Sequence, residues 1–212
     1  MLRYSASSNF NKVRGRFASN LPYYANPYKG NGCLGLVRED FSMWERRSPL
    51  CPHHVQELVR QGLKVIVQPS AKRIYTDKEY LDAGAVIKED LSDASLVIGV
   101  KQIPAAKIAH NKSYLFFSHT IKAQANNMDL LDTILDRKAR LFDYECITEG
   151  GLDGKPRLVA FGKYAGVAGM IDCFQGLGQK LLAEGFSNPF LNIPQSYMYQ
   201  NLDEARYTLR SI

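Results

Sequence analysis

Short apolar runs alternate with amphipathic segments along this chain, and the alternation predicts an α/β fold. The runs are too short for helices and are rich in β-branched and aromatic residues, which is typical of buried strands. They lie at 34–37, 64–68, 85–87, 96–100, 114–117 and 140–144. Apolar residues recur at helical spacing over the segments 53–60, 77–83 and 123–138. Because strands separated by helices favour parallel pairing, we expect a mainly parallel sheet flanked by helices.

A glycine-rich turn and a long helix are predicted after the last of these strands. The turn at 149–155 indicates a hairpin into a further strand at 157–161. The segment 164–183 carries an apolar stripe at helical spacing, and another helix is predicted over 204–212. The glycines inside the long helix are Gly166, Gly169, Gly176 and Gly178. Each costs about 1 kcal/mol relative to alanine, so we expect another backbone or a ligand to approach this helix closely.

Two residues that can carry protons follow two of the predicted strands. Lys101 comes directly after the run at 96–100, and His119 follows the run at 114–117 after one intervening serine. The carboxyl ends of parallel strands share the ligand-binding edge of a sheet, and adjacent strands lie about 4.8 Å apart, so both side chains could reach one small molecule. Taken singly, such a lysine is commonly a solvated charge and such a histidine a structural residue. The pair favours acid–base chemistry, because histidine exchanges protons near neutral pH.

A charged loop follows the first predicted strand. It places Glu45, Arg46 and Arg47 beside Trp44 and is kept irregular by two prolines. The planar fork of arginine suits a carboxylate, which makes this loop a candidate anion-binding segment. The alternative is a solvated charged turn.

Composition narrows the possible partners. The chain has 212 residues, of which 45% are hydrophobic, and no apolar run approaches the roughly 18 residues of a membrane span. Residues 1–38 contain six of the 27 basic residues and no acidic residue. The rest of the chain is therefore balanced, with 21 basic and 21 acidic residues. We therefore expect neither a membrane span nor a nucleic-acid-binding surface on the domain.

The cysteines do not suggest a disulfide framework or a metal site. Four of them are widely spaced, and none forms a C-x-x-C pair. Cys51 lies close to His53 and His54, but no further ligand nearby completes the three or four that a metal site needs. We interpret this segment as the start of a helix and predict reduced thiols and no metal.

The chain divides into three predicted parts. Residues 1–32 are basic, lack acidic residues and are rich in serine and asparagine, which indicates a mitochondrial presequence or, alternatively, a disordered basic arm. Residues 33–162 are predicted to form the α/β domain, which the family resemblance given below implies to be a substrate-binding domain. Residues 163–212 hold the long glycine-bearing helix and the start of a linker.

The common nucleotide-binding motifs and the hydrolase nucleophile motif are missing from the sequence. The nearest glycine pair, Gly176 and Gly178, lies inside a predicted helix and lacks the third glycine of a dinucleotide fingerprint. Neither a P-loop nor a G-x-S-x-G motif is present.

Several strings together carry a family resemblance. They are VREDFSMWERRSPLCPHHV, GLKVIVQPSAKRIYTDKEYLDAGA, IGVKQIP, FFSHTIKAQ, DYE and VAFGKYAGVAGMID, running from about Gly35 to Asn201. Through them the chain resembles the N-terminal part of lysine–2-oxoglutarate reductase, the first activity of mitochondrial aminoadipic semialdehyde synthase. More distantly it is similar to the substrate domains of fungal saccharopine dehydrogenase and alanine dehydrogenase.

The resemblance implies a chemistry and roles for individual residues. The ε-amine of lysine condenses with the ketone of 2-oxoglutarate, and NADPH reduces the imine to saccharopine in the mitochondrial matrix. Lys101 and His119 match the acid–base pair of the family. Residues matching substrate-binding positions are Arg47, Arg46, Glu45, Glu145 and Lys122.

The resemblance also implies what this chain would not do alone. In the family, a Rossmann domain for the cofactor follows the long helix, whereas this sequence ends at Ile212. We therefore expect a substrate-binding portion that binds no cofactor and is inactive alone. The alternative is a non-catalytic binding or regulatory protein that keeps this fold in mitochondria and docks to a full-length synthase.

Overall fold

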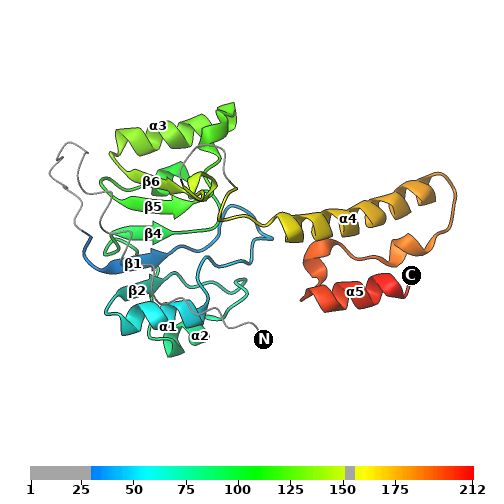
Figure 1. Ribbon diagram of the computed structural model, residues 1–212, viewed down its shortest axis with the longest axis horizontal. Helices are drawn as coiled ribbons and strands as arrows, with labels where there is room; N and C mark the ends of the chain where they lie inside the picture. The colour runs from blue at the N-terminus through cyan, green and yellow to red at the C-terminus, as the bar shows by residue number, and fades with distance from the viewer. Residues whose placement is uncertain (1–29, 151–155) are drawn as a thin grey trace. The chain divides into compact units, whose positions relative to one another are not determined.

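A six-stranded parallel sheet forms the centre of the protein. The computed structural model describes residues 30–150 and 156–212, and Gly32–Ile212 form one compact unit. The strand order is β3-β2-β1-β4-β5-β6, and each of these pairings is parallel (Figure 1). The strands are β1 (Cys33–Leu36), β2 (Lys64–Val67), β3 (Val86–Ile87), β4 (Leu96–Ile98), β5 (Ser113–Phe116) and β6 (Arg140–Asp143). The predicted α/β class and mainly parallel sheet are confirmed.

Two hydrophobic layers cover the faces of the sheet. On one face, α1 (Pro52–Arg60) and α2 (Asp77–Asp82) contribute Val55 and Tyr80 to a core with Leu36. On the other face, α3 (Met128–Asp136) and a 3-10 turn, η2 (Ala105–Lys107), pack against the sheet. Alternate residues of each strand enter opposite layers. Burying each large aliphatic side chain contributes about 1.5–3 kcal/mol, so these layers hold the strand ends in place.

The helix predicted over 123–138 is shorter than expected. The chain first makes two 3-10 turns, η3 (Thr120–Lys122) and η4 (Ala125–Asn127), and α3 begins only at Met128. Ala123 lies between the turns with φ of 51°, in the left-handed region that a right-handed helix excludes. The apolar periodicity predicted α3 but could not show this break.

The hairpin predicted into a strand at 157–161 is wrong. Most of its turn lies outside the described residues, and the described part forms only an isolated antiparallel bridge between Thr148 and Arg157. Residues 157–161 are mostly exposed and lead directly into the next helix. Without a buried face, this segment has no packing that would hold it as a strand.

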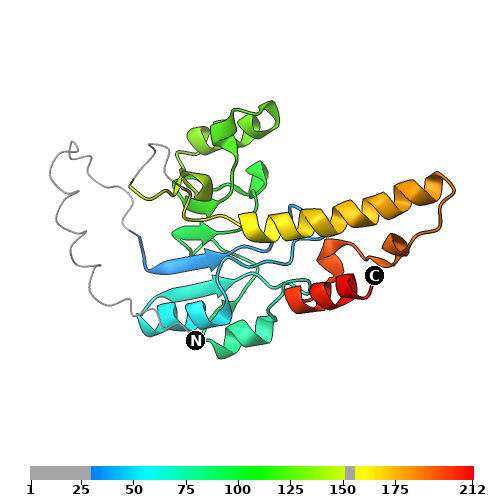
Figure 2. The ribbon, with the colours of Figure 1, turned by 45° about the vertical axis from the view of Figure 1, so that its right-hand side comes forward.

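A helical segment follows the sheet. It contains α4 (Gly162–Ala183), η6 (Pro189–Asn192), η7 (Ser196–Met198) and α5 (Leu202–Arg210). Ile171, Ile193 and Ala205 form its core, and both views show α5 alongside α4 (Figures 1 and 2). Within the described residues, no helix is long and apolar enough to cross a membrane.

Only one of the four glycines predicted to mark a close approach is explained by a neighbour. A Cβ at Gly178 would lie 2.9 Å from backbone atoms of both Phe190 and Leu191. A Cβ at Gly166, Gly169 or Gly176 would meet no described atom within 4 Å. The presequence prediction falls on residues that lie almost wholly outside the described part of the chain.

Candidate functional site

Lys101 and His119 reach the same edge of the sheet from adjacent strands. β4 and β5 pair in register, with Leu96 opposite Ser113, and the Phe117 amide donates to the Val100 carbonyl at 3.1 Å beyond the strand ends. Both side chains line one pocket of about 280 Å³. The remaining lining residues are Arg47, Phe117, Glu145, Arg157, Val159, Ala160, Phe161, Gly162 and Ala165. The structure therefore brings together the two residues that the strand pattern identified.

His119 holds an uncommon backbone conformation. Its φ is 57° and its ψ is 10°, in the left-handed region where histidine is among the more tolerated residues. The preceding Ser118 is fully buried, and its hydroxyl and amide both donate to Oδ2 of Asp143. The other oxygen of Asp143 accepts the Glu145 amide at 2.8 Å. Asp143 thus fixes the backbone next to both His119 and Glu145.

Glu145 is an anion surrounded by three basic side chains. Its Oε1 lies 3.1 Å from Lys122 Nζ and 2.7 Å from Arg157 Nη1, and its Oε2 lies 3.0 Å from His119 Nδ1. The Glu145 side chain is only 5% exposed. Burial acts to raise the pKa of Glu145, but hydrogen bonds from Lys122 and His119 outweigh burial and lower it. Glu145 is therefore an ionised counterion at neutral pH.

The contact with Glu145 sets which nitrogen of His119 is available. An ionised carboxylate can only accept, so Nδ1 of His119 is the donor in this contact, and in the neutral imidazole Nε2 is then the acceptor. Lys122 Nζ lies 3.3 Å from the same Nδ1, but its stronger partner is the carboxylate. The ring of Phe117 stacks on the imidazole at 6.2 Å between centroids. The imidazole is thereby held with Nε2 free to act on a ligand.

Arg47 enters the pocket already paired. Its Nε donates to Glu45 Oε1 at 2.8 Å and its Nη2 to Oε2 at 2.6 Å, and its guanidinium lies 5.0 Å from the ring centroid of Phe161. Burial acts to raise the pKa of Glu45, but the hydrogen bonds from Arg47 outweigh it and lower the pKa. Glu45 therefore orients Arg47 rather than lining the pocket itself.

Besides Glu45, two further predicted substrate residues do not line the pocket. Arg46 points elsewhere, and its Nε donates to the Lys72 carbonyl at 3.2 Å. Lys122 acts on the site only through Glu145 and His119.

Several residues in or next to the pocket were not predicted from the sequence. Arg157 and Phe161 belong to the segment that was predicted as a strand, and Phe117 was assigned only to the core of a strand. Glu39 is buried, with its carboxylate on the amides of Val100 and Lys101. Burial raises the pKa of Glu39, against the two backbone donors. No sequence signal distinguishes Glu39 from the other charges of its loop.

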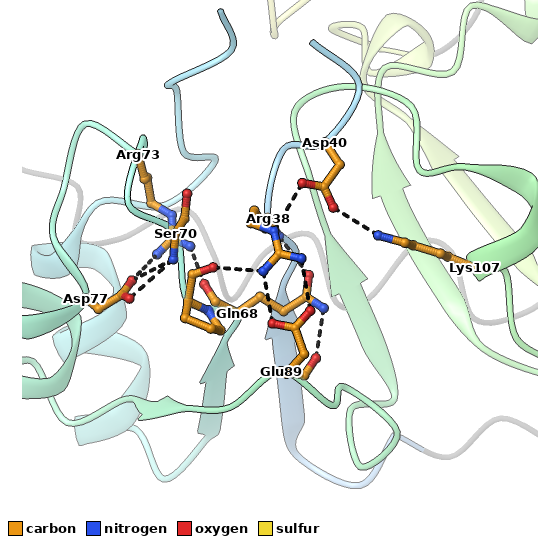
Figure 3. A network of polar contacts seen from close by, with 9 residues as sticks. Arg38, Asp40, Gln68, Ser70, Arg73, Asp77, Glu89 and Lys107 are labelled. Carbon is orange, nitrogen blue, oxygen red and sulfur yellow. Dashed lines mark hydrogen bonds and ion pairs between the residues drawn. The ribbon is translucent and has the colours of Figure 1, made fainter. Parts of the chain in front are cut away.

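A polar network anchors the loop that carries Glu39 and Arg47 (Figure 3). Arg38 donates twice to Glu89, at 2.9 Å each, and its Nε donates to Asp40 at 3.1 Å. Gln68 accepts from the Arg38 amide at 2.9 Å, and Asp40 pairs with Lys107 at 2.9 Å. These contacts tie the end of β1 to residues that follow β2 and β3.

The remaining cofactor candidates do not fit. Cys51 Sγ lies 3.3 Å from His54 Nδ1, but in the ranges 30–150 and 156–212 no three metal-ligating side chains converge. Gly178 lies inside α4, where the backbone of Phe190 and Leu191 fills the space beside it. Gly176 and Gly178 therefore form no cradle for a pyrophosphate.

Known proteins resemble this chain over the segment that builds the pocket. Residues 35–168 match the family model of the alanine dehydrogenase/PNT N-terminal domain. The alpha-aminoadipic semialdehyde synthase of Arabidopsis thaliana is 48% identical over 189 residues, which are 86% of this chain and 18% of that protein. The mitochondrial alpha-aminoadipic semialdehyde synthase of Bos taurus is 47% identical over 178 residues, or 84% of this chain and 19% of that protein. The resemblance predicted from the motifs is confirmed.

A more distant relative covers less of the chain. The saccharopine dehydrogenase (NAD(+), L-lysine-forming) of Yarrowia lipolytica is 31% identical over 138 residues, which are 63% of this chain and 37% of that protein. The chain spans about a fifth of the length of the two synthases above.

Proposed function

Since the chain belongs to the alanine dehydrogenase/PNT N-terminal domain family, we propose that it is the substrate-binding portion of a lysine–2-oxoglutarate reductase. In this reaction saccharopine forms from lysine and 2-oxoglutarate with NADPH, during lysine degradation. The observation that carries the proposal is the convergence of Lys101 and His119 with Arg47 in one pocket. The synthases and the saccharopine dehydrogenase described above support the substrate class.

The charges of the pocket suit a keto diacid. Arg47, Lys101 and Arg157 line it, and among the described residues of the lining Glu145 is the one acidic side chain. The first turn of α4, which contains no acidic residue, also lines the pocket at Gly162. Helix N-termini and arginine forks both favour carboxylates. We propose that the carboxylates of 2-oxoglutarate bind these groups with the ketone towards Lys101.

Lys101 and His119 would manage the protons of imine formation. As the neutral ε-amine attacks the ketone, the nitrogen becomes positively charged and the ketone oxygen negatively charged. Nε2 of His119 can take the excess proton from nitrogen and pass it to that oxygen, which gives the carbinolamine. Lys101 as an ammonium has donors only, so it can protonate the carbinolamine hydroxyl, which leaves as water. Loss of water leaves an iminium, which a hydride would convert to the neutral secondary amine, and the neutral Lys101 would regain its proton from solvent.

The described residues contribute no cofactor step to this proposal. NADPH would supply the hydride when bound, but the glycine pair of α4 does not fit its pyrophosphate, as described above. We therefore propose that this chain alone does not turn over. We also propose that it works in the mitochondrial matrix, and the name of the Bos taurus relative, which says mitochondrial, supports the organelle.

A non-catalytic binding role is the second candidate. Apolar side chains of α4 stand exposed, including Tyr164 at 65% and Met170 at 56%. Exposed apolar side chains favour a docking role if no substrate binds.

Titration calorimetry on the 212-residue chain tests the proposal. We expect saccharopine and 2-oxoglutarate to bind, and glutarate, which lacks the ketone, to bind more weakly. Arg47→Lys should weaken 2-oxoglutarate binding about tenfold, because lysine cannot reproduce a two-point contact with a carboxylate. Arg46→Lys is the matched control and should leave the affinity unchanged. A folded chain that binds neither ligand, or equal losses in both variants, would contradict the proposal.

A further inference from the structure

Glu39 lies behind the pocket and contacts the main chain of Lys101. We propose that Glu39 is a positioning residue, which holds the end of β4 and thereby sets where Lys101 stands in the pocket. The inference rests on the function proposed above for Lys101, but the anchoring itself can be tested separately. No sequence motif pointed to Glu39, and it does not line the pocket.

The carboxylate of Glu39 completes a hydrogen-bond ladder that the backbone leaves open. The Val37 amide donates to the Ile98 carbonyl at 3.0 Å, which is the last bond between β1 and the extended β4. In a parallel ladder the next donor, the Val100 amide, would bond a carbonyl of β1. Instead it donates to Glu39 Oε1 at 2.5 Å, and the Lys101 amide donates to Oε2 at 3.0 Å. One side chain thus satisfies two successive donors where β1 leaves the sheet.

A carboxylate suits this place better than any neutral side chain. It offers two acceptors and no donor, and hydrogen bonds to a charged acceptor are about twice as strong as neutral ones. Glu39 is only 7% exposed, so water cannot readily replace it. Glutamine would present one acceptor and one amide group, and the amide group would oppose a backbone N–H. A buried donor would then lack a partner.

The surroundings leave the carboxylate little freedom. A Cβ at Gly99 would lie 2.8 Å from Val37 Cγ1 and 3.4 Å from Glu39 Oε1, so the glycine makes room for this arrangement. On its other side, Glu39 follows Arg38, which the Glu89 and Asp40 contacts clamp in place (Figure 3). Glu39 is therefore held both at its carboxylate and at its main chain next to Arg38. The position of Lys101 thus depends on the segment after β1 as well as on β4.

Hydrogen exchange followed by NMR tests the anchor without any ligand. In Glu39→Gln, at least one of the amides of Val100 and Lys101 should exchange about tenfold faster or more, because the amide group of glutamine leaves that backbone donor without an acceptor. The Gly99 amide, which bonds the Leu115 carbonyl, should keep its rate. Glu57→Gln is the matched control, since it makes the same change in an exposed acid of α1 that pairs with His53. Equal acceleration at all three amides, or none, would overturn the anchor.

A double-mutant cycle tests whether the anchor acts through Lys101. Glu39→Gln should weaken 2-oxoglutarate binding about tenfold in the wild-type background and less than about twofold in the Lys101→Met background. An equal loss in both backgrounds would refute positioning and leave Glu39 a stabilising residue. Failure of the wild-type chain to bind 2-oxoglutarate would refute the proposed function and the positioning role, while the exchange rates would still decide the anchor.

Discussion

Alanine at Gly178 should destabilise the protein, whereas alanine at Gly169 should stabilise it. Both glycines lie within α4, so both substitutions gain the same helix propensity. They differ in what the new methyl group meets. At Gly178 it would lie 2.9 Å from Leu191 N and from Phe190 C, and at Gly169 no described atom lies within 4 Å.

The magnitudes follow from that difference. Each substitution gains about 1 kcal/mol of helix propensity. At Gly178 the obstacle is backbone, which cannot rotate away, so η6 must shift. That shift disturbs the Asn188 Nδ2 bond to the Gly178 carbonyl at 3.1 Å and the stacking of Phe190 on Phe174 at 5.7 Å. Overpacking of this kind costs about 1–3 kcal/mol, so Gly178→Ala should lose up to about 2 kcal/mol net.

Urea unfolding followed by circular dichroism measures both variants against the wild type. We expect the two free energies of unfolding to differ by about 1–3 kcal/mol, with Gly169→Ala the more stable. Thermal midpoints should separate in the same order, by about 2–4 °C for each kcal/mol in a chain of this size. Similar shifts for both variants would show that η6 does not lie against Gly178.

Three further predictions concern the core and the site. Tyr80→Phe should lower the free energy of unfolding by about 1–3 kcal/mol, because the buried hydroxyl donates to the Leu50 carbonyl at 2.6 Å. Urea unfolding of the variant measures this, and an unchanged free energy would contradict it. Burial acts to raise the pKa of Glu145, but hydrogen bonds from Lys122 and His119 keep this pKa below the ordinary value of 4.5. The charge of Glu145 therefore stabilises the folded state above pH 4.5, and this stabilisation is lost as the pH falls through the lowered pKa. The difference in unfolding free energy between the wild type and Glu145→Gln should therefore be largest above pH 4.5 and shrink in acid, and a difference that grows in acid would refute the sign. Lys101→Met or His119→Ala, placed in a full-length synthase, should lower turnover about 100-fold or more while the circular dichroism spectrum stays the same; near-normal turnover would remove that residue from proton transfer.

The parts of this fold that follow from local pattern were predictable. Buried strands are short apolar runs, so the predicted strand positions lie close to the observed ones. The parallel pairing of the strands and the position of Lys101 and His119 at one pocket also follow the prediction. Each depends on the regular geometry of a parallel sheet, in which the carboxyl ends share one edge. The long helix was also recognised, because its apolar stripe is local.

The parts that depend on distant contacts were not predictable. Glu39 is important only because β1 leaves the sheet one bond before β4 ends, and that mismatch is a property of two strands together. The failed hairpin at 157–161 has the same origin, since a strand needs a partner and a buried face that a single segment cannot reveal. Of the four glycines, only Gly178 has a neighbouring backbone among the described residues, and the chain reaches that neighbour after it turns at the end of α4.

The distance between His119 and Glu145 depends on one buried carboxylate. The two residues stand at the ends of adjacent strands, β5 and β6, where the left-handed turn at His119 would by itself be unfavourable. Asp143 holds Ser118 with one oxygen and the Glu145 amide with the other, so it fixes both backbones at once. Asp143 therefore supports the 3.0 Å contact between the imidazole and Glu145 from the backbone side. Asp143 itself does not line the pocket, so a ligand that enters the pocket leaves in place the carboxylate that fixes these two backbones.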